Sequence, residues 1–201
     1  MKAIVFLNGE PLNGINVSGY DLIVSADGAL DYCEKNSIKP DVVLGDFDSL
    51  GRVPENAIVY PCDKDLTDGE IALNCAIEKG AKEIVFACSG GLREDHFFGN
   101  VSLIEIASKR GVRASLLTNY SRIFFVTGEF SETVEIGSFV SLYALSDSDV
   151  ECSDGLKYVY NNTKLLRATT LGISNVATKT NVSLKVKSGA VLVFLNHSNV
   201  N

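Results

Sequence analysis

The feature that most constrains the fold is a change of hydrophobic pattern near residue 118. Before this point, short and almost continuously apolar runs alternate with segments whose apolar residues recur at helical spacing. We expect strands at 3–7, 22–26, 42–44, 58–60, 83–88 and 112–117, and helices at 28–35, 67–79 and 95–109. Apolar strands that alternate with helices predict a mostly parallel sheet with helices on both faces.

Beyond residue 118 the apolar runs become short, alternating and rich in β-branched residues. We expect strands at 123–126, 133–136, 139–145, 182–186 and 191–195, separated by turns such as 153–155 and 161–162 that are rich in Gly, Asn, Ser and Asp. This pattern predicts an antiparallel β-sandwich. The chain is therefore expected to form two domains, an α/β domain at 1–119 and a β-sandwich domain at 120–201.

The net charge of −7 arises in the first half of the chain. Residues 1–100 carry 8 basic and 17 acidic side chains, whereas residues 101–201 carry 10 basic and 8 acidic ones. This balance argues against nucleic-acid binding, which depends on Lys and Arg. No apolar run approaches the roughly 18 residues of a membrane span, and the N-terminal run is too short for a secretory signal. We expect a cytoplasmic protein that binds neither nucleic acid nor membrane.

Acidic residues and glycines follow four of the expected strands, at the point where each strand ends. In chain order these residues are Asp27, then Asp46 and Asp48, then Asp63, Asp65 and Asp68, then the segment Gly90-Gly91-Leu92-Arg93-Glu94-Asp95-His96. The carboxyl ends of parallel strands share one edge of the sheet, and open α/β sheets bind ligands at that edge. The sequence therefore predicts that these residues contribute to one site.

The residue types at this edge indicate a chemistry. Crowded carboxylates repel one another, and Mg²⁺ relieves the repulsion while also binding phosphate oxygens. Lys64 and Arg93 are cationic, and Gly90 and Gly91 precede a helix whose N-terminus favours anions. Together these groups predict Mg-nucleotide phosphoryl chemistry.

Each residue also has a simpler explanation when it is taken alone. Aspartates are common in turns and at helix N-termini for structural reasons, and a pair of glycines is often only a turn. The repetition of the pattern after four strands favours a shared site. The sequence contains neither a P-loop motif nor the glycine motif of dinucleotide-binding folds, so those two classes lose support.

At these residues the sequence resembles the thiamine pyrophosphokinase family. The matching pieces are Ser25-Ala26-Asp27-Gly28-Ala29, Gly45-Asp46-Phe47-Asp48-Ser49, Asp63-Lys64-Asp65-Leu66-Thr67-Asp68, Gly90-Gly91 with Arg93, Asp95-His96 and Asn100, and Gly172-Ile173-Ser174-Asn175 with 189–193. They cover nearly the whole chain in order. One departure is Leu92, because many family members have the Arg directly after the glycines. The chain also has no Trp for a contact to thiamine.

The resemblance implies an N-terminal α/β catalytic domain and a C-terminal β-sandwich. It further implies a homodimer that binds thiamine between the catalytic domain of one subunit and the β domain of the other. ATP and Mg²⁺ would be required, and the diphosphate of ATP would be transferred to the hydroxyl of thiamine, leaving AMP. An acidic site also suits thiamine because thiamine is a cation.

The resemblance also implies roles for individual residues. Metal binding is expected for Asp46, Asp48 and Asp68, and catalysis for Asp46, Asp68 and Asp95. Nucleotide binding is expected for Asp27, Lys64, Thr67, Gly90, Gly91 and Arg93. Thiamine binding is expected for Asp95, Ser174 and Asn175.

Two other functions are compatible with parts of the pattern. The Asp46-x-Asp48 pair after a strand suits a phosphatase with an aspartate nucleophile, although the loops at 63–68 and 90–91 would then have no role. A nucleotide- or thiamine-binding regulator without activity is the second alternative, against which the retained carboxylates argue.

Overall fold

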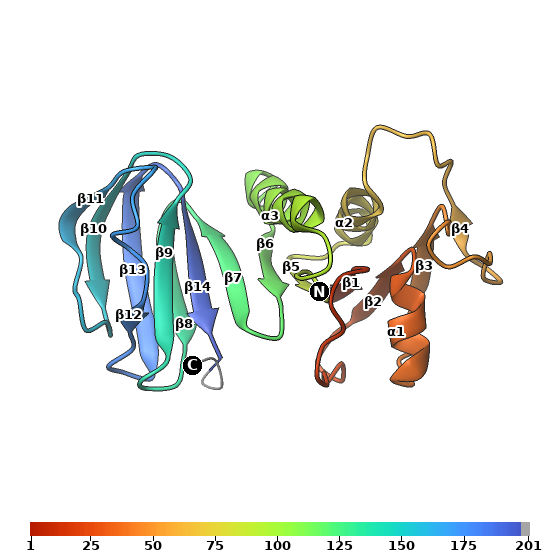
Figure 1. Cartoon of the computed structure of the whole chain (residues 1–201), viewed down its shortest axis with the longest axis horizontal. Coiled ribbons are helices and arrows are strands. Elements are labelled where there is room, and N and C mark those ends of the chain that lie inside the picture. The colour runs from red at the N-terminus through yellow and green to blue at the C-terminus, as the bar shows by residue number, and fades with distance from the viewer. Residues whose placement is uncertain (198–201) are drawn as a thin grey trace. The chain divides into compact units, whose positions relative to one another are not determined.

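The computed structural model describes residues 1–197 and divides the chain into two compact units, an N-terminal unit Met1–Asn119 and a C-terminal unit Tyr120–Asn201 (Figure 1). Each unit has its own hydrophobic core. Among the described residues, no helix has both the length and the apolar composition needed to cross a membrane.

The N-terminal unit contains a sheet of six strands in the order β6-β5-β1-β2-β3-β4. The strands are β1 (Lys2–Phe6), β2 (Leu22–Ala26), β3 (Val42–Gly45), β4 (Ile58–Val59), β5 (Glu83–Ala87) and β6 (Arg113–Leu117). All neighbouring pairs run parallel. Because the chain continues from β1 towards β2 on one side and returns to β5 on the other, the order reverses at β1, and ligands of open α/β sheets bind at such a reversal.

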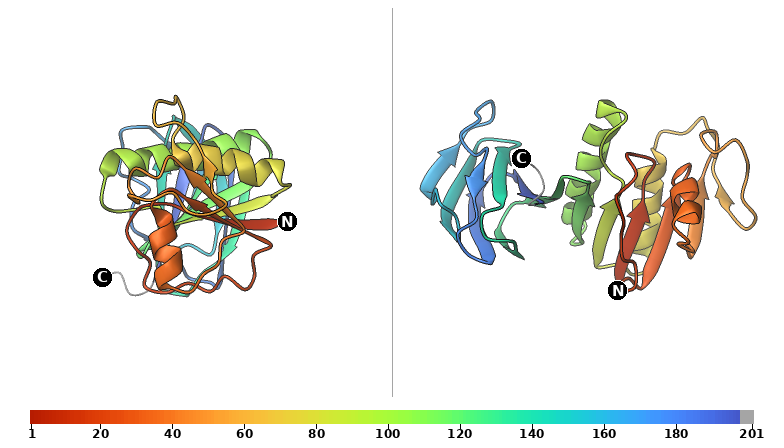
Figure 2. Two further views of the ribbon diagram at one scale, coloured as in Figure 1. Left: turned by 90° about the vertical axis from the view of Figure 1, so that its right-hand side faces the viewer. Right: turned by 60° about the horizontal axis from the view of Figure 1, so that its bottom comes forward.

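Helices cover both faces of this sheet. Helix α1 (Ala29–Lys35) lies on one face, whereas α2 (Asp68–Glu78) and α3 (Glu94–Lys109) lie on the other (Figures 1 and 2). Alternation along β1 explains the arrangement, since Ile4 and Phe6 pack into the core cluster that contains the buried side chains of α1. The predicted parallel sheet with helices on both faces is confirmed.

Helix α2 begins where the sequence places its start. Thr67 has an extended backbone, and its Oγ1 accepts a hydrogen bond from the backbone N–H of Glu70 at 3.2 Å. This bond satisfies one of the N–H groups that a helix leaves free in its first turn. The side chain of Asp68 is thereby fixed at the first helical position, at the carboxyl edge of the sheet.

The C-terminal unit consists of antiparallel strands in two four-stranded layers. One layer has the order β12-β9-β14-β7 and the other β11-β10-β13-β8. The strands are β7 (Ser121–Val126), β8 (Glu129–Thr133), β9 (Phe139–Ala144), β10 (Ser148–Asp154), β11 (Asn161–Leu165), β12 (Asn175–Val176), β13 (Asn181–Ser188) and β14 (Val191–Asn196). One apolar cluster draws side chains from both layers, so the predicted β-sandwich is confirmed.

Some local predictions in this unit are wrong. The strand expected at 133–136 is shifted, because β8 ends at Thr133 and Val134 instead packs against the core from outside a strand. The segments 153–155 and 161–162 were expected as turns, yet β10 extends to Asp154 and β11 begins at Asn161. Both strands are polar in sequence, and they are formed by pairing with each other and, for β10, with β13.

Candidate functional site

A cavity of about 420 Å³ opens at the carboxyl edge of the N-terminal unit. Its lining combines charged, polar and apolar groups from the loops that follow β1, β2, β3, β4 and β5 and from the first turns of α2 and α3. These residues are Leu7, Asn8, Gly9, Ala26, Asp27, Ser49, Cys62, Lys64, Leu66, Thr67, Asp68, Gly69, Ser89, Gly91, Leu92, Arg93, His96, Phe97 and Asn100. The cavity therefore lies where the strand order predicts a ligand.

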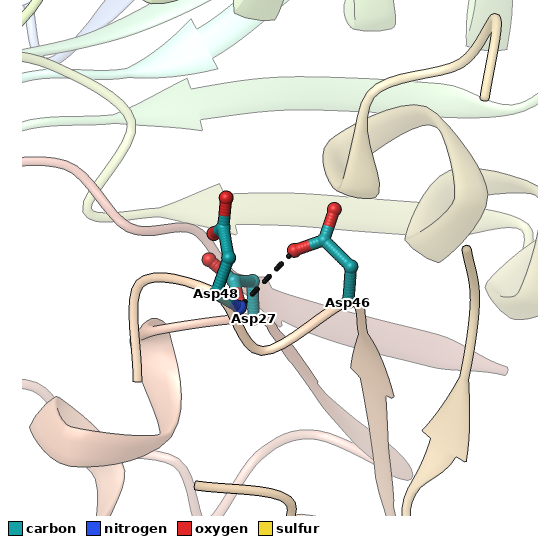
Figure 3. A group of neighbouring side chains, drawn as sticks. All are labelled: Asp27, Asp46 and Asp48. Atoms are coloured by element: carbon teal, nitrogen blue, oxygen red, sulfur yellow. Dashed lines mark hydrogen bonds between the residues drawn. The ribbon is translucent and has the colours of Figure 1, made fainter. Parts of the chain in front are cut away.

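Three carboxylates converge beside this cavity. Asp27, Asp46 and Asp48 each offer an oxygen, and these oxygens lie within 4.8 Å of one another (Figure 3). We call these residues the acid triad. Asp46 Oδ1 accepts the backbone N–H of Asp48 at 3.3 Å, and the hydroxyl of Ser49 donates to Asp48 Oδ1 at 3.1 Å. These bonds orient two of the three carboxylates but leave most of their lone pairs open.

Asp27 is the buried member of the triad. Its side chain belongs to a residue that is only 7% exposed, and Oδ1 has no hydrogen-bond partner among residues 1–197. A buried carboxylate oxygen without a partner is costly. This oxygen is the feature of the site that most directly indicates cation binding.

The backbone around the triad is held in an unusual conformation. Asp27 and Phe47 have φ angles of 48° and 61°, in the left-handed region. Gly45 has a φ of 151°, and a Cβ placed on it would lie 2.9 Å from Asp27 Cα. Only glycine allows this approach, so the Gly-Asp-Phe-Asp-Ser segment folds closely over the loop of Asp27. Strained backbone of this kind concentrates at functional sites.

Lys64 joins the acid triad to helix α2. Its ammonium donates a hydrogen bond to Asp46 Oδ2 and lies 3.3 Å from Asp68 Oδ1. The second distance satisfies an ion pair, but Asp68 Oδ1 accepts no well-formed hydrogen bond from the described residues. We therefore interpret Lys64 as bonded to Asp46 and only electrostatically attracted to Asp68.

The pKa values follow from this arrangement. The hydrogen bond from Lys64 lowers the pKa of Asp46. Burial by itself would lower the pKa of Lys64, but the bond to Asp46 and the charge of Asp68 outweigh it, so the pKa is raised. Burial raises the pKa of Asp68, and the attraction to Lys64 offsets only part of this effect. Lys64 and Asp46 are consequently both charged, as a site for anions and cations requires.

The glycine-rich segment after β5 folds tightly against its surroundings. A Cβ on Gly90 would lie 2.9 Å from Thr118 Cγ2, and a Cβ on Gly91 would lie 2.6 Å from Glu10 Cβ. Gly91 also has a φ of 69°. The local fold therefore requires glycine at both positions.

Arg93 and Asp95 form a bidentate ion pair at the start of α3. Arg93 Nε and Nη2 donate to the two carboxylate oxygens of Asp95 at 3.1 and 2.6 Å. The bond from Arg93 lowers the pKa of Asp95 to about 2, and the backbone N–H of His96 contributes further. Both side chains are well exposed, so the pair can open when a ligand offers better partners.

The two remaining predicted residues lie in the C-terminal unit and differ from each other. Ser174 is exposed, has a φ of 62°, and its backbone N–H donates to Ser141 Oγ at 3.0 Å. Asn175 is 4% exposed, and its amide bonds the N–H and C=O of Tyr158 at 3.0 and 2.7 Å. The amide of Asn175 thus holds the local fold, whereas Ser174 is exposed to solvent.

Some residues of the cavity were assigned no role from the sequence. Asn8 and Gly9 follow β1 as Asp27 follows β2, so the same strand-end criterion applies to them. Asn100 Nδ2 donates to the backbone oxygen of Ser89 at 2.9 Å and ties α3 to the end of β5. Asn8 and Gly9 are neutral and therefore draw less attention than acids at the same strand ends. Asn100 belongs to the family resemblance, which by itself gives it no role.

The geometry described so far suits a divalent cation and a chain of phosphates. The acid triad supplies hard oxygen ligands, and Asp27 lacks a partner that a cation would provide. Lys64, the N-terminus of α2 and the glycine-rich loop supply positive charge and N–H groups nearby.

The sequence is similar to one known protein family. Residues 16–116 match the family model for the thiamin pyrophosphokinase catalytic domain. A thiamine pyrophosphokinase of Bacillus subtilis (strain 168) is 32% identical over 192 residues, which is 87% of this chain and 89% of that protein.

Solved structures show the same fold over the whole chain. A thiamine pyrophosphokinase structure from Bacillus subtilis has a TM-score of 0.85 at 24% identity and covers 98% of this chain and 100% of its own. A thiamin pyrophosphokinase family protein from Enterococcus faecalis has a TM-score of 0.87 at 20% identity, with 99% and 100% covered.

Proposed function

The chain belongs to the thiamine pyrophosphokinase family, and from this premise we propose that it transfers the diphosphate of ATP to the hydroxyl of thiamine. The products are thiamine diphosphate and AMP. The observation that carries the proposal is the acid triad with its unpartnered Asp27 oxygen, next to Lys64 and to the cavity that Asp27 and Lys64 both line.

The residues present fit Mg²⁺. The acid triad would hold the ion, so Asp27 joins the expected ligands Asp46 and Asp48. Asp68 also lies next to Lys64 and would add a fourth carboxylate to the site. A bound Mg²⁺ neutralises and orients phosphate oxygens. The position of Asp27 depends on Gly45, because a side chain there would displace the Asp27 backbone.

Phosphate binding is assigned to Lys64, Thr67, Gly90, Gly91 and Arg93. The ammonium of Lys64 neutralises part of the negative charge of Asp46 and Asp68. It would interact with phosphate oxygens once a cation neutralises these carboxylates. Charge develops on these oxygens during transfer, so a fixed ammonium stabilises the transition state more than the ground state.

Thiamine binding is assigned to Asp95, Ser174 and Asn175, in a homodimer as the family resemblance implies. The pKa of Asp95 is about 2, so its carboxylate is charged at neutral pH and attracts the thiamine cation. Ser174 would contact thiamine directly, and Asn175 would act by holding the Ser174 segment through its bonds to Tyr158. On this proposal residues 1–119 form the catalytic ATP- and Mg-binding domain, and residues 120–201 the thiamine-binding domain.

The test is to incubate the protein with ATP, MgCl₂ and thiamine and to separate the products. We expect AMP and thiamine diphosphate in equal amounts, and neither product when MgCl₂ is replaced by EDTA. ADP with thiamine monophosphate would overturn diphosphate transfer. Phosphate released from a phosphate ester in the absence of ATP would instead support the phosphatase alternative.

A further inference from the structure

Leu92 occupies a position that is unfavourable for a leucine in two ways. It is 75% exposed, although it is a large apolar residue. It also has a φ of 61°, and the backbone N–H of Arg93 donates to the oxygen of Gly91 at 2.8 Å across it. A three-residue turn with a positive central φ is rare and strained. The turn presents the Leu92 side chain outward at the cavity.

Two more apolar side chains line the same cavity. Leu66 is 40% exposed, and Phe97 is half-buried in the first turn of α3. We call Leu66, Leu92 and Phe97 the apolar lip. The rest of the lining includes the charged side chains of Asp27, Lys64 and Asp68 as well as buried apolar residues such as Leu7. Accessible apolar side chains and charged side chains therefore line the same cavity.

We propose that the apolar lip binds the base of the nucleotide substrate, with Leu92 as its most exposed contact. The inference rests on the proposed function, because it takes ATP as the ligand of this cavity. A nucleoside triphosphate suits both kinds of side chain, since its flat uncharged base is joined to a charged phosphate chain.

The chain neighbours of the two leucines favour the nucleotide over thiamine. Leu66 directly precedes Thr67, and Leu92 directly follows Gly91, so both leucines adjoin residues assigned to phosphates. Thiamine carries a fixed positive charge, and apolar side chains do not compensate a charge. A neutral base loses little when it leaves water for such a surface and covers exposed leucine at the same time.

The apolar lip has a consequence for kinetics and selectivity. Contacts to a base far from the reacting phosphorus are the same in the ground state and the transition state. Their loss therefore weakens binding and leaves kcat unchanged. Leucine side chains also offer no hydrogen bonds, so ATP and GTP should lose affinity together when Leu92 is changed.

The experiment measures binding to the intact protein by calorimetry, with a non-hydrolysable ATP analogue and with tripolyphosphate, each in the presence of Mg²⁺. Leu92→Asn removes the apolar surface while keeping a residue that tolerates positive φ, and Leu92→Met retains an apolar side chain. Leu166→Asn is the matched control, because Leu166 is 54% exposed and lies outside the cavity. Turnover of each variant is measured alongside.

We expect Leu92→Asn to raise the Kd for the ATP analogue about tenfold, or about 1.4 kcal/mol, with tripolyphosphate binding and kcat unchanged. Leu92→Met and Leu166→Asn should stay within about twofold of the wild type. An unchanged Kd for the analogue, an equal loss for tripolyphosphate, or a loss confined to thiamine would each overturn the assignment. A wild-type protein that turns over no substrate would count against the proposed function itself.

Discussion

Two buried polar side chains, Asp27 in the N-terminal unit and Asn175 in the C-terminal unit, are treated differently by their surroundings. Asn175 uses its whole amide on the backbone of Tyr158 and Val176. Asp27 keeps one carboxylate oxygen without a partner among the described residues, next to two further carboxylates. A satisfied polar group stabilises its fold, whereas an unsatisfied one is tolerated where a ligand completes it. The difference supports a ligand site in the N-terminal unit.

The largest effect is expected for the acid triad. Asp46→Asn removes a charge that would serve the metal and the acceptor of the Lys64 ammonium. Turnover should fall by at least about a thousandfold, because electrostatic stabilisation is the main catalytic contribution at such sites. Circular dichroism and the melting temperature should remain close to those of the wild type. Loss of activity through unfolding would remove the support for a metal role.

The opposite behaviour is expected for Asn175. Asn175→Ala removes the side-chain partner of the backbone N–H groups of Tyr158 and Val176 and of the backbone oxygen of Tyr158. The free energy of unfolding should fall by about 2 kcal/mol, as measured by urea denaturation in the absence of ligands. Nucleotide binding to the folded fraction should be unchanged. A fully stable variant would show that the amide is not a structural group and would erase the contrast with Asp27.

The smallest effect is expected for Thr67, which caps helix α2 and also lines the cavity. Thr67→Ala should lower the free energy of unfolding by about 1 kcal/mol. Thr67→Ser keeps the capping hydroxyl and should therefore retain most of the wild-type stability. Urea denaturation without ligands measures the capping contribution alone. If both variants were equally destabilised, the hydroxyl would not be the cap.

The two units also differ in how far the sequence predicts them. Strand β2 occupies the predicted residues, and α2 lies within one residue of its predicted bounds, because local periodicity and the Thr67 cap determine them. In the C-terminal unit, β10 pairs with β13 through register shifts near Val150. Such pairing depends on partners distant in the chain, so polar strands like β10 leave little trace in local pattern.

The same distinction applies to the site. The strand-end criterion finds every member of the acid triad, since it requires only the order of strands and loops. It does not predict that Asp27, rather than Asp68, approaches Asp46 and Asp48, because this depends on Gly45 lying against the Asp27 backbone. Nor does it show that Asn175 is buried and that its amide is hydrogen-bonded to the backbone of Tyr158.

Metal binding tests most directly the claim that the unpartnered Asp27 oxygen marks a cation site. Mn²⁺ is titrated into the protein in the presence of a non-hydrolysable ATP analogue, and free Mn²⁺ is followed by electron paramagnetic resonance. We predict one tight Mn²⁺ per chain, with affinity reduced at least about tenfold in Asp27→Asn and unchanged in Asn175→Ala. Equal Mn²⁺ affinity in the wild type and Asp27→Asn would contradict the claim.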